Sequence, residues 1–293
     1  MFFTPTAFYS LSSANTLKLT FDNITNADLI VGDSSNLNDW NTFFDLPNLG
    51  RAFTKVEVVG NTVRLLGGKD IKVKPALMYA YINDTFLIKV EDIGGCITSV
   101  GGDAFSYCAG LTDVNLPACT IVYGFDDSPQ NDYGGFGECI NLFNLSLPLL
   151  TLAGNGAFYG CTSLTTISLP SLTLAGDSCF YSCTSVTTLS LPQLTTAGFT
   201  CFSFLTSLAT INLPQLTSTL LASFASCTSV TTISLPACTD LGGTVGNDSV
   251  FSGITGQTIT LTVPSALITC NSGDPDGDID ILQTNNTVSV ITV

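Results

Sequence analysis

A proline and a phenylalanine recur at a fixed spacing along most of the chain, and this repeat restricts the possible folds more than any other feature. The prolines are Pro117, Pro148, Pro170, Pro192, Pro214 and Pro236, with Pro264 as a looser last member. The phenylalanines are Phe105, Phe136, Phe158, Phe180, Phe202, Phe224 and Phe251. Four successive steps measure 22 residues in both series, while the first measures 31. This period predicts a solenoid of about seven units, each of which buries its apolar side only against its neighbours.

Each unit contains one short stretch of alternating apolar and hydroxyl side chains. Leu164, Ile167 and Leu169 are interspersed with Thr166 and Ser168, a pattern typical of a strand. Proline then ends the strand because it lacks the N–H that a sheet requires. We therefore predict a mainly β protein in three parts: a small β-rich attachment or assembly domain over 1–92, a parallel β-solenoid over 93–265, and a C-terminal cap or strand-exchange segment over 266–293.

The repeated pattern resembles a known family. The unit reads A-F-x-G-C-x-S-L-x-x-I-x-L-P, as in the run from Ala157 to Pro170, and it is closely similar to the BspA-type leucine-rich repeat. The resemblance covers about residues 93–265, with Leu205 and Ile254 in place of the cysteine in two units. It implies a leucine-rich-repeat solenoid with a role in cell-surface adhesion and in binding glycoproteins or matrix. A repeat fold carries many functions, so the site has to be argued separately.

The eleven cysteines follow the repeat. Five occupy one position of the unit: Cys108, Cys139, Cys161, Cys183 and Cys227. Four more stand where other units have small or apolar residues such as Ala157 or Leu150: Cys119, Cys179, Cys201 and Cys238. A cysteine that exchanges with alanine or leucine acts as a small buried apolar group, so we predict free thiols. Cys96 and Cys270 lie outside these positions and are the better candidates for a disulfide. A thiolate metal site is disfavoured because no C-x₂-C pair exists.

Stacking would align the polar strand residues of successive units in two rows. The first row is predicted as Asp113, Asn144, Thr166, Thr188, Thr210, Thr232 and Thr258. The second is predicted as Asn115, Ser146, Ser168, Ser190, Asn212, Ser234 and Thr260. A hydroxyl-rich, nearly uncharged sheet can hydrogen-bond a sugar chain or another protein. The alternatives are a solvated sheet face that needs no ligand, because threonine suits exposed strands, and an ice-binding array.

Two insertions interrupt the repeat at the same phase, near 122–135 and near 241–250. Insertions at one phase project from one side of a solenoid, which is often the binding side. The first insertion holds an aromatic and acidic mixture that suits recognition of a sugar or a basic patch: Tyr123, Asp126, Asp127, Asp132 and Tyr133. A plain surface loop is the equal alternative. The same aspartates would be the carboxylates of a glycoside hydrolase, which we disfavour because the sequence suggests no buried constellation.

The first 92 residues show no repeat. Strands are expected at 17–21, at 56–66 around Gly60-Asn61, and at 85–90, with a short helix at 38–44 that Ser35 or Asn36 would cap. Three lysines lie close together and could dock an acidic partner: Lys69, Lys72 and Lys74. The segment NDWNTFFDLPNLG, followed by FTKVEVVGNTVRLLGG, is similar to N-terminal regions of bacteriophage virion proteins.

The segment after the last unit is acidic. Asp274, Asp276, Asp278 and Asp280 alternate with other residues and could bind calcium, although the glycine and the residue at position twelve, Asn285, do not match an EF-hand loop. The favoured alternative is an acidic, solvated turn before a final strand at 287–293. That strand would cap the solenoid or pair with another subunit.

Charge and composition exclude several classes of function. The chain has 8 Lys+Arg, 23 Asp+Glu and no histidine, with a formal net charge of -15. Such a chain does not suit nucleic acid or anionic lipid surfaces, and it lacks the histidine of Ser-His-Asp and Cys-His enzymes. No apolar run reaches the length of a membrane span, and the N-terminus has no signal-peptide pattern.

We therefore predict a non-enzymatic structural and adhesion protein of a phage virion appendage, such as a tail or head fibre. Its repeats would bind a host-surface glycan or protein. Its partners would be other virion proteins and further copies of itself in a homo-oligomer, for example a trimer, with no nucleic acid and no membrane insertion. It would assemble in the host cytoplasm and need no cofactor, apart from the calcium alternative. The alternative is a bacterial cell-surface adhesin with BspA-like repeats, and a polysaccharide-degrading enzyme is disfavoured.

Overall fold

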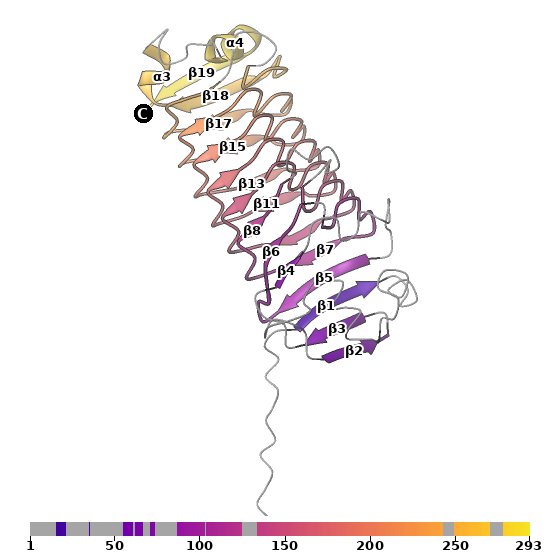
Figure 1. Ribbon diagram of the computed structural model, residues 1–293. Helices are drawn as coiled ribbons and strands as arrows, with labels where there is room; N and C mark the ends of the chain where they lie inside the picture. The colour runs from indigo at the N-terminus through magenta and orange to yellow at the C-terminus, as the bar shows by residue number, and fades with distance from the viewer. Residues whose placement is uncertain are drawn as a thin grey trace, which may run out of the picture.

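The computed structural model describes residues 16–21, 35, 55–60, 62–66, 71–73, 87–102, 104–124, 134–242, 249–269 and 278–293. The molecule is an elongated stack of short strands that runs from the N-terminal strands to the C-terminal helices (Figure 1). The three-residue strands belong to three sheets of six, two and four strands, which also include the longer N- and C-terminal strands, while the two-residue strands belong to one seven-stranded sheet. The prediction of a mainly β solenoid of leucine-rich-repeat type is confirmed.

The three-residue strands form the face that we call the strand face. Its strands in the solenoid are β7 (Asp113–Asn115), β9 (Asn144–Ser146), β11 (Thr166–Ser168), β13 (Thr188–Ser190), β15 (Thr210–Asn212) and β17 (Thr232–Ser234), followed by β18 (Thr258–Val263) and β19 (Thr287–Thr292). Within each of these sheets the solenoid strands pair in parallel and in register, so that Thr166 lies beside Thr188 and Ser168 beside Ser190. Their central residues, such as Ile167 and Ile211, are buried. The predicted alternation therefore places the polar rows outside.

The seven-stranded sheet, which we call the second sheet, contains the two-residue strands. In spatial order they run from β4 (Ile71–Val73) through β6 (Ile97–Val100), β8 (Ile121–Val122), β10 (Leu152–Ala153), β12 (Leu174–Ala175) and β14 (Thr196–Ala197) to β16 (Ser218–Thr219). One residue of each pair, such as Ala153, Ala175 and Ala197, points into the core. The stretch after each proline therefore forms a second short strand.

The N-terminal strands extend the strand face. β1 (Thr16–Phe21) lies antiparallel between β3 (Thr62–Leu66) and β5 (Leu87–Ile93), and β2 (Lys55–Val59) forms a hairpin with β3. Gly60 has a φ of 58° in the hairpin turn, which glycine adopts without steric cost. β5 then pairs in parallel with β7. The three strand regions expected before residue 92 are confirmed, and the proposed boundary at 92/93 falls inside β5.

Several expected features lie outside the described residues. These are the helix at 38–44, Lys69 and Lys74, the insertion residues 125–133 and 243–248, and the segment 270–277. Lys72 lies in β4, but its side chain is not described.

A column of parallel phenylalanine rings fills the centre of the solenoid. From Phe136 to Phe224 these side chains have no exposed surface. Adjacent ring centroids are 5.2–6.0 Å apart, and the ring planes differ by 3–15°. Each interior ring therefore contacts a ring above and a ring below, which explains why every unit keeps phenylalanine at this position.

The turns that carry these rings have an unusual backbone. The residue two positions after the phenylalanine has positive φ in all seven units: Tyr107, Glu138, Gly160, Ser182, Phe204, Ser226 and Gly253. Around Phe158, the amides of Gly156, Phe158 and Gly160 donate to the carbonyls of Asp177, Cys179 and Tyr181, each at 2.8 Å. These three hydrogen bonds all point from one unit to the next. The same one-directional pattern recurs around Phe136, Phe180 and Phe202.

The ten cysteines that the structure describes are free and buried, as predicted. The thiols of Cys139, Cys161, Cys183 and Cys227 each donate to a phenylalanine carbonyl of the preceding unit at 3.0–3.2 Å. Cys96, a candidate for a disulfide, is also free, and its thiol lies 3.0 Å from Oδ1 of the buried Asp92. Cys270 lies outside the described residues.

The C-terminal segment corrects one expectation. Asp278 and Asp280 belong to a helix, α4 (Asp278–Asn285), where the sequence predicted a turn. A shorter helix, α3 (Ser265–Thr269), follows β18. The expected final strand is confirmed as β19, which pairs in parallel with β18 over six residues. Among the described helices, none is long and apolar enough to cross a membrane.

Candidate functional site

The strand face is hollowed near its N-terminal end. A cavity of about 450 Å³ opens over β5, β7, β9 and β11. We call it the strand-face pocket, and its lining residues are Lys89, Glu91, Asp113, Val114, Asn115, Phe143, Asn144, Leu145, Ser146, Thr165, Thr166 and Ser168. Six predicted members of the two rows lie in this lining: Asp113, Asn115, Asn144, Ser146, Thr166 and Ser168.

Strand register brings the polar side chains of the pocket together. Asp113 lies beside Lys89 on one side and Asn144 on the other, while Asn115 lies between Glu91 and Ser146. The intervening residues Val90 and Val114 are buried in the core. Because side chains alternate along a strand, every second residue must face the pocket.

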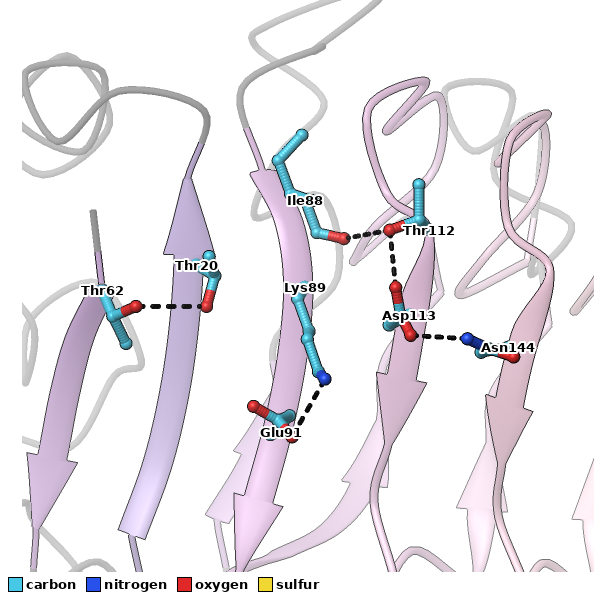
Figure 2. Close-up of polar contacts among 8 residues, drawn as sticks. All are labelled: Thr20, Thr62, Ile88, Lys89, Glu91, Thr112, Asp113 and Asn144. Carbon is cyan, nitrogen blue, oxygen red and sulfur yellow. Dashed lines mark hydrogen bonds and ion pairs between the residues drawn. The ribbon is translucent and has the colours of Figure 1, made fainter. Parts of the chain in front are cut away.

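Asp113 is the centre of a hydrogen-bond network (Figure 2). Nδ2 of Asn144 donates to its Oδ1 at 2.7 Å. The hydroxyl of Thr112 lies 2.7 Å from its Oδ2 and 3.1 Å from the carbonyl oxygen of Ile88. Partial burial acts to raise the pKa of Asp113, but the hydrogen bonds from Thr112 and Asn144, together with the charge of Lys89, outweigh it and lower the pKa. Asp113 is therefore a fixed carboxylate at neutral pH.

The polar row continues beyond the repeats onto the N-terminal strands. Thr20 pairs with Lys89 and with Thr62, and the two threonine hydroxyls are 3.4 Å apart (Figure 2). Nζ of Lys89 forms an ion pair with Oε1 of Glu91 at 3.1 Å. The described part of the strand face thus carries a polar row that begins at β3, three strands before β7, the strand of the first unit.

Sequence reasoning missed the N-terminal half of this site. Lys89 and Glu91 alternate with Ile88 and Val90. This alternation is sufficient to predict a strand, but it does not show which other strands pair with it. Phe143 was also missed. It is half exposed and stands at the phase where other units have Thr165, Thr187 or Thr231, so the only available signal was a bulky aromatic residue in a threonine column.

The remaining predicted residues of the rows extend away from the pocket. Thr188, Ser190, Thr210 and Asn212 are exposed, and Thr232 and Ser234 are half buried. The last members were predicted wrongly: Thr232 pairs with Thr260 and Ser234 with Thr262, so both rows shift by two residues at β18. The prediction assumed a regular spacing between units, and the interval from Phe224 to Phe251 departs from the 22-residue step.

The residues of the insertions and of the acidic segment do not join this site among the described residues. Tyr123 is exposed just after β8, on the other sheet. Asp126, Asp127, Asp132 and Tyr133 lie outside the described residues, as do Asp274 and Asp276. Within the described part of the chain, no group of three potential metal ligands occurs. Calcium binding stays a prediction.

A second threonine row shows what structural hydroxyls look like in this protein. The threonine three residues after each proline donates its hydroxyl to a carbonyl of the preceding unit at 3.0–3.3 Å: Thr120, Thr151, Thr173, Thr195, Thr217 and Thr239. In contrast, the hydroxyls of Thr166, Ser168 and Thr188 have no hydrogen-bond partner among the described residues. The strand face therefore keeps its donors available to a ligand.

The chemistry of the pocket favours binding over catalysis. A hydrolase that uses two carboxyl groups needs one with a raised pKa as the general acid. Asp113 has a lowered pKa, and Glu91 is engaged by Lys89. An exposed aromatic ring beside amides, hydroxyls and a fixed carboxylate is instead a set that can receive the apolar face and the hydroxyl groups of a sugar.

Stacked units with a short strand on one face and a buried phenylalanine column define a leucine-rich-repeat solenoid. Residues 132–269 match the BspA type leucine rich repeat region in six copies. The repeated unit of this segment is therefore similar to the BspA-type leucine-rich repeat, as the sequence resemblance implied.

Comparison with other proteins adds two solved structures. A leucine-rich repeat protein from Bacteroides ovatus has 18% identity and a TM-score of 0.39, and the match covers 69% of this chain and 59% of that chain. A leucine rich cell surface protein from Faecalibacterium prausnitzii has 15% identity and a TM-score of 0.26, with 80% of this chain and 90% of that chain covered. No curated protein matches.

Proposed function

We propose that this protein is a non-enzymatic adhesion protein that binds a surface glycan along its strand face. The observation that carries the proposal is the contrast between two sets of hydroxyls. Thr173 and Thr195 donate theirs to the backbone, whereas Thr166 and Ser168 leave theirs toward the pocket without a partner in the described structure. Unengaged donors on a flat sheet suit a ligand with many hydroxyl groups.

Charge narrows the class of glycan. The pocket contains one lysine, one glutamate and one aspartate, and Lys89 is already paired with Glu91. The whole chain carries a formal charge of -15, so an anionic glycan would be repelled on approach. We therefore propose a neutral or amino-sugar glycan, with Phe143 against the apolar face of one sugar ring and Asp113 and Asn144 at its hydroxyls.

The test is binding of the full chain to immobilised neutral, amino-sugar and sialylated glycans. Asp113→Ala and Phe143→Ser are expected to weaken binding to neutral or amino-sugar glycans by about 5- to 30-fold, because each removes a contact worth about 1–2 kcal/mol. Gln193→Ala is the matched control, since Gln193 is exposed but outside the pocket. Equal binding by the pocket variants and the control would refute the proposed site. A protein ligand without glycan would show as binding that survives deglycosylation of the target.

Two settings fit such a surface, a bacterial cell surface and a virion appendage such as a tail or head fibre. In both, a solenoid with few charges holds a binding face away from its attachment point. Detection of the chain in purified phage particles supports the virion setting. Its detection only in the surface fraction of intact bacteria supports the cellular one.

A further inference from the structure

The two ends of the strand face differ in how they are protected. At the N-terminal end the edge strand is β2, which carries Lys55 and Glu57 and belongs to an antiparallel hairpin. Charged residues on an edge strand discourage pairing with another chain. At the C-terminal end the edge strand is β19, with the sequence TVSVIT and no charged residue or proline (Figure 1). Within the described part of the chain, β19 therefore lacks the charged residues and the proline that usually protect an edge strand.

β19 is held firmly on its inner side. It pairs with β18 over six residues without a bulge. Asn286, just before it, donates to the carbonyls of Ile254 and Leu282 at 2.9 Å. Val288 and Val290 pack against the core. The strand is thus a rigid template and not a frayed end.

Backbone geometry shows which groups the outer edge presents. The amides of Thr287 and Val293 donate to the carbonyls of Gln257 and Val263 in the β18 region, and the carbonyl of Val293 accepts from Ser265. Because backbone groups alternate in direction along a strand, Val288, Val290 and Thr292 direct their N–H and C=O groups outward. β19 is the last strand of its sheet, so no described strand pairs with these groups.

These outward residues are arranged symmetrically about Val290. If two copies meet antiparallel, Val290 lies opposite the same residue of the second copy, and Val288 lies opposite Thr292. Each of these three pairs can exchange two N–H···O bonds, about six in all. The valines packed against each core would also become neighbours across the junction. The geometry points to a second copy of this chain as the partner of β19, in a twofold dimer with a continuous strand face.

Exposed side chains support the same partner. Ile291 and Val293 are 50% and 62% exposed. In the proposed register Ile291 lies opposite Ser289 of the second copy. Both side chains are uncharged, so this contact brings no like charges together. The net charge of -15 on each copy opposes association, and salt should therefore strengthen the dimer by screening.

The experiment measures the mass of the full chain by sedimentation over a wide concentration range, at low and high salt. A dimer that tightens with salt is expected for the natural chain. Thr292→Pro removes an outward N–H and should raise the Kd of the dimer about tenfold or more, whereas Thr292→Val keeps the N–H and should leave the Kd within about twofold. Thr292 is exposed, so neither change removes core packing.

A charge pair provides the second arm. Ser289→Lys with Ile291→Lys places lysines opposite each other and should abolish the dimer, while Ser289→Glu with Ile291→Lys places opposite charges together and should retain it. Thermal melts report whether each variant is folded. A monomeric natural chain at all concentrations would overturn the proposal. A dimer that persists in both Thr292→Pro and the double-lysine variant would also overturn it, because another surface would then be responsible. Glycan binding by Asp113→Ala is independent of these outcomes.

Discussion

The phenylalanine column makes a quantitative prediction for the centre of the solenoid. Phe180 has no exposed surface, and its ring centroid lies 5.3 Å from that of Phe158 and 5.6 Å from that of Phe202. Phe180→Ala removes a fully buried ring and both ring contacts. A buried phenylalanine-to-alanine change costs about 3–5 kcal/mol, and the two stacked neighbours place Phe180 in the upper part of that range, at about 4–5 kcal/mol.

Two further variants separate the causes of this loss. Phe180→Leu keeps most of the buried volume but loses both ring contacts, so it should cost about 2 kcal/mol. Phe199→Ala changes a phenylalanine that is 42% exposed and should cost less than about 1 kcal/mol. Urea unfolding followed by far-ultraviolet circular dichroism measures all three.

Hydrogen exchange tests the spatial extent of the damage. Each unit contacts only its neighbours, so protection in Phe180→Ala should fall first at the amides of Phe158, Phe180 and Phe202, which bond from unit to unit. Equal loss of stability in Phe180→Ala and Phe199→Ala would refute the claim that the column carries the core.

Three other predictions follow from the same structure. Burial raises the pKa of Cys183 and of Cys227 to about 12, so both thiols should resist alkylation at mildly alkaline pH until the chain unfolds; mass spectrometry that finds either labelled in the folded chain would contradict this. The pKa of Asp113 is lowered from 3.8, so its carboxylate stabilises the fold above about pH 4, and this stabilisation is lost as the pH falls through the lowered pKa. A carbon NMR titration should show that the pKa of Asp113 rises in Asn144→Ala. An unchanged pKa would show that the hydrogen bond from Asn144 is not a cause of the shift. Gly160→Ala should destabilise the fold by about 1–2 kcal/mol, because Gly160 has a φ of 67° and an added Cβ would lie 2.7 Å from Oε1 of Glu138. Ser182 occupies the same position of the next unit with a φ of 58°, so Ser182→Gly should stabilise the fold by about 0.5 kcal/mol. Urea midpoints that move in the same direction in both variants would contradict the argument that the positive φ strains the backbone.

The fold of the repeats was predictable because one signal recurs seven times. The strands, the buried Phe158 and Cys161, and the outward Thr166 and Ser168 all follow from the alternation and the 22-residue step. Prediction was wrong where that step changes: the 27-residue interval between Phe224 and Phe251 shifted the partners of Thr232 and Ser234 by two residues.

The candidate site was only half predictable. Asp113, Asn144 and Thr166 belong to the repeats and were identified. Lys89 and Thr20 come from strands whose pairing is set by contacts between residues far apart in the sequence, which periodicity does not report. The helix over 278–285 was missed because its sequence, DIDILQTN, begins with alternating acidic and apolar residues, a pattern that does not indicate a helix. Ile279 and Leu282, three residues apart and both buried, were the helical signal.

The one-directional hydrogen bonds of the phenylalanine turns are opposed by those beside the second sheet. In the turns an amide donates to the next unit, as that of Phe158 does to the carbonyl of Cys179. Beside the two-residue strands the direction is reversed, because the amides of Thr173 and Gly176 donate to the carbonyls of Thr151 and Ala153 in the preceding unit. Each peptide group has a dipole of about 3.5 D, so the dipoles on the two sides of the solenoid offset one another and the stack does not acquire the axial dipole of an α-helix.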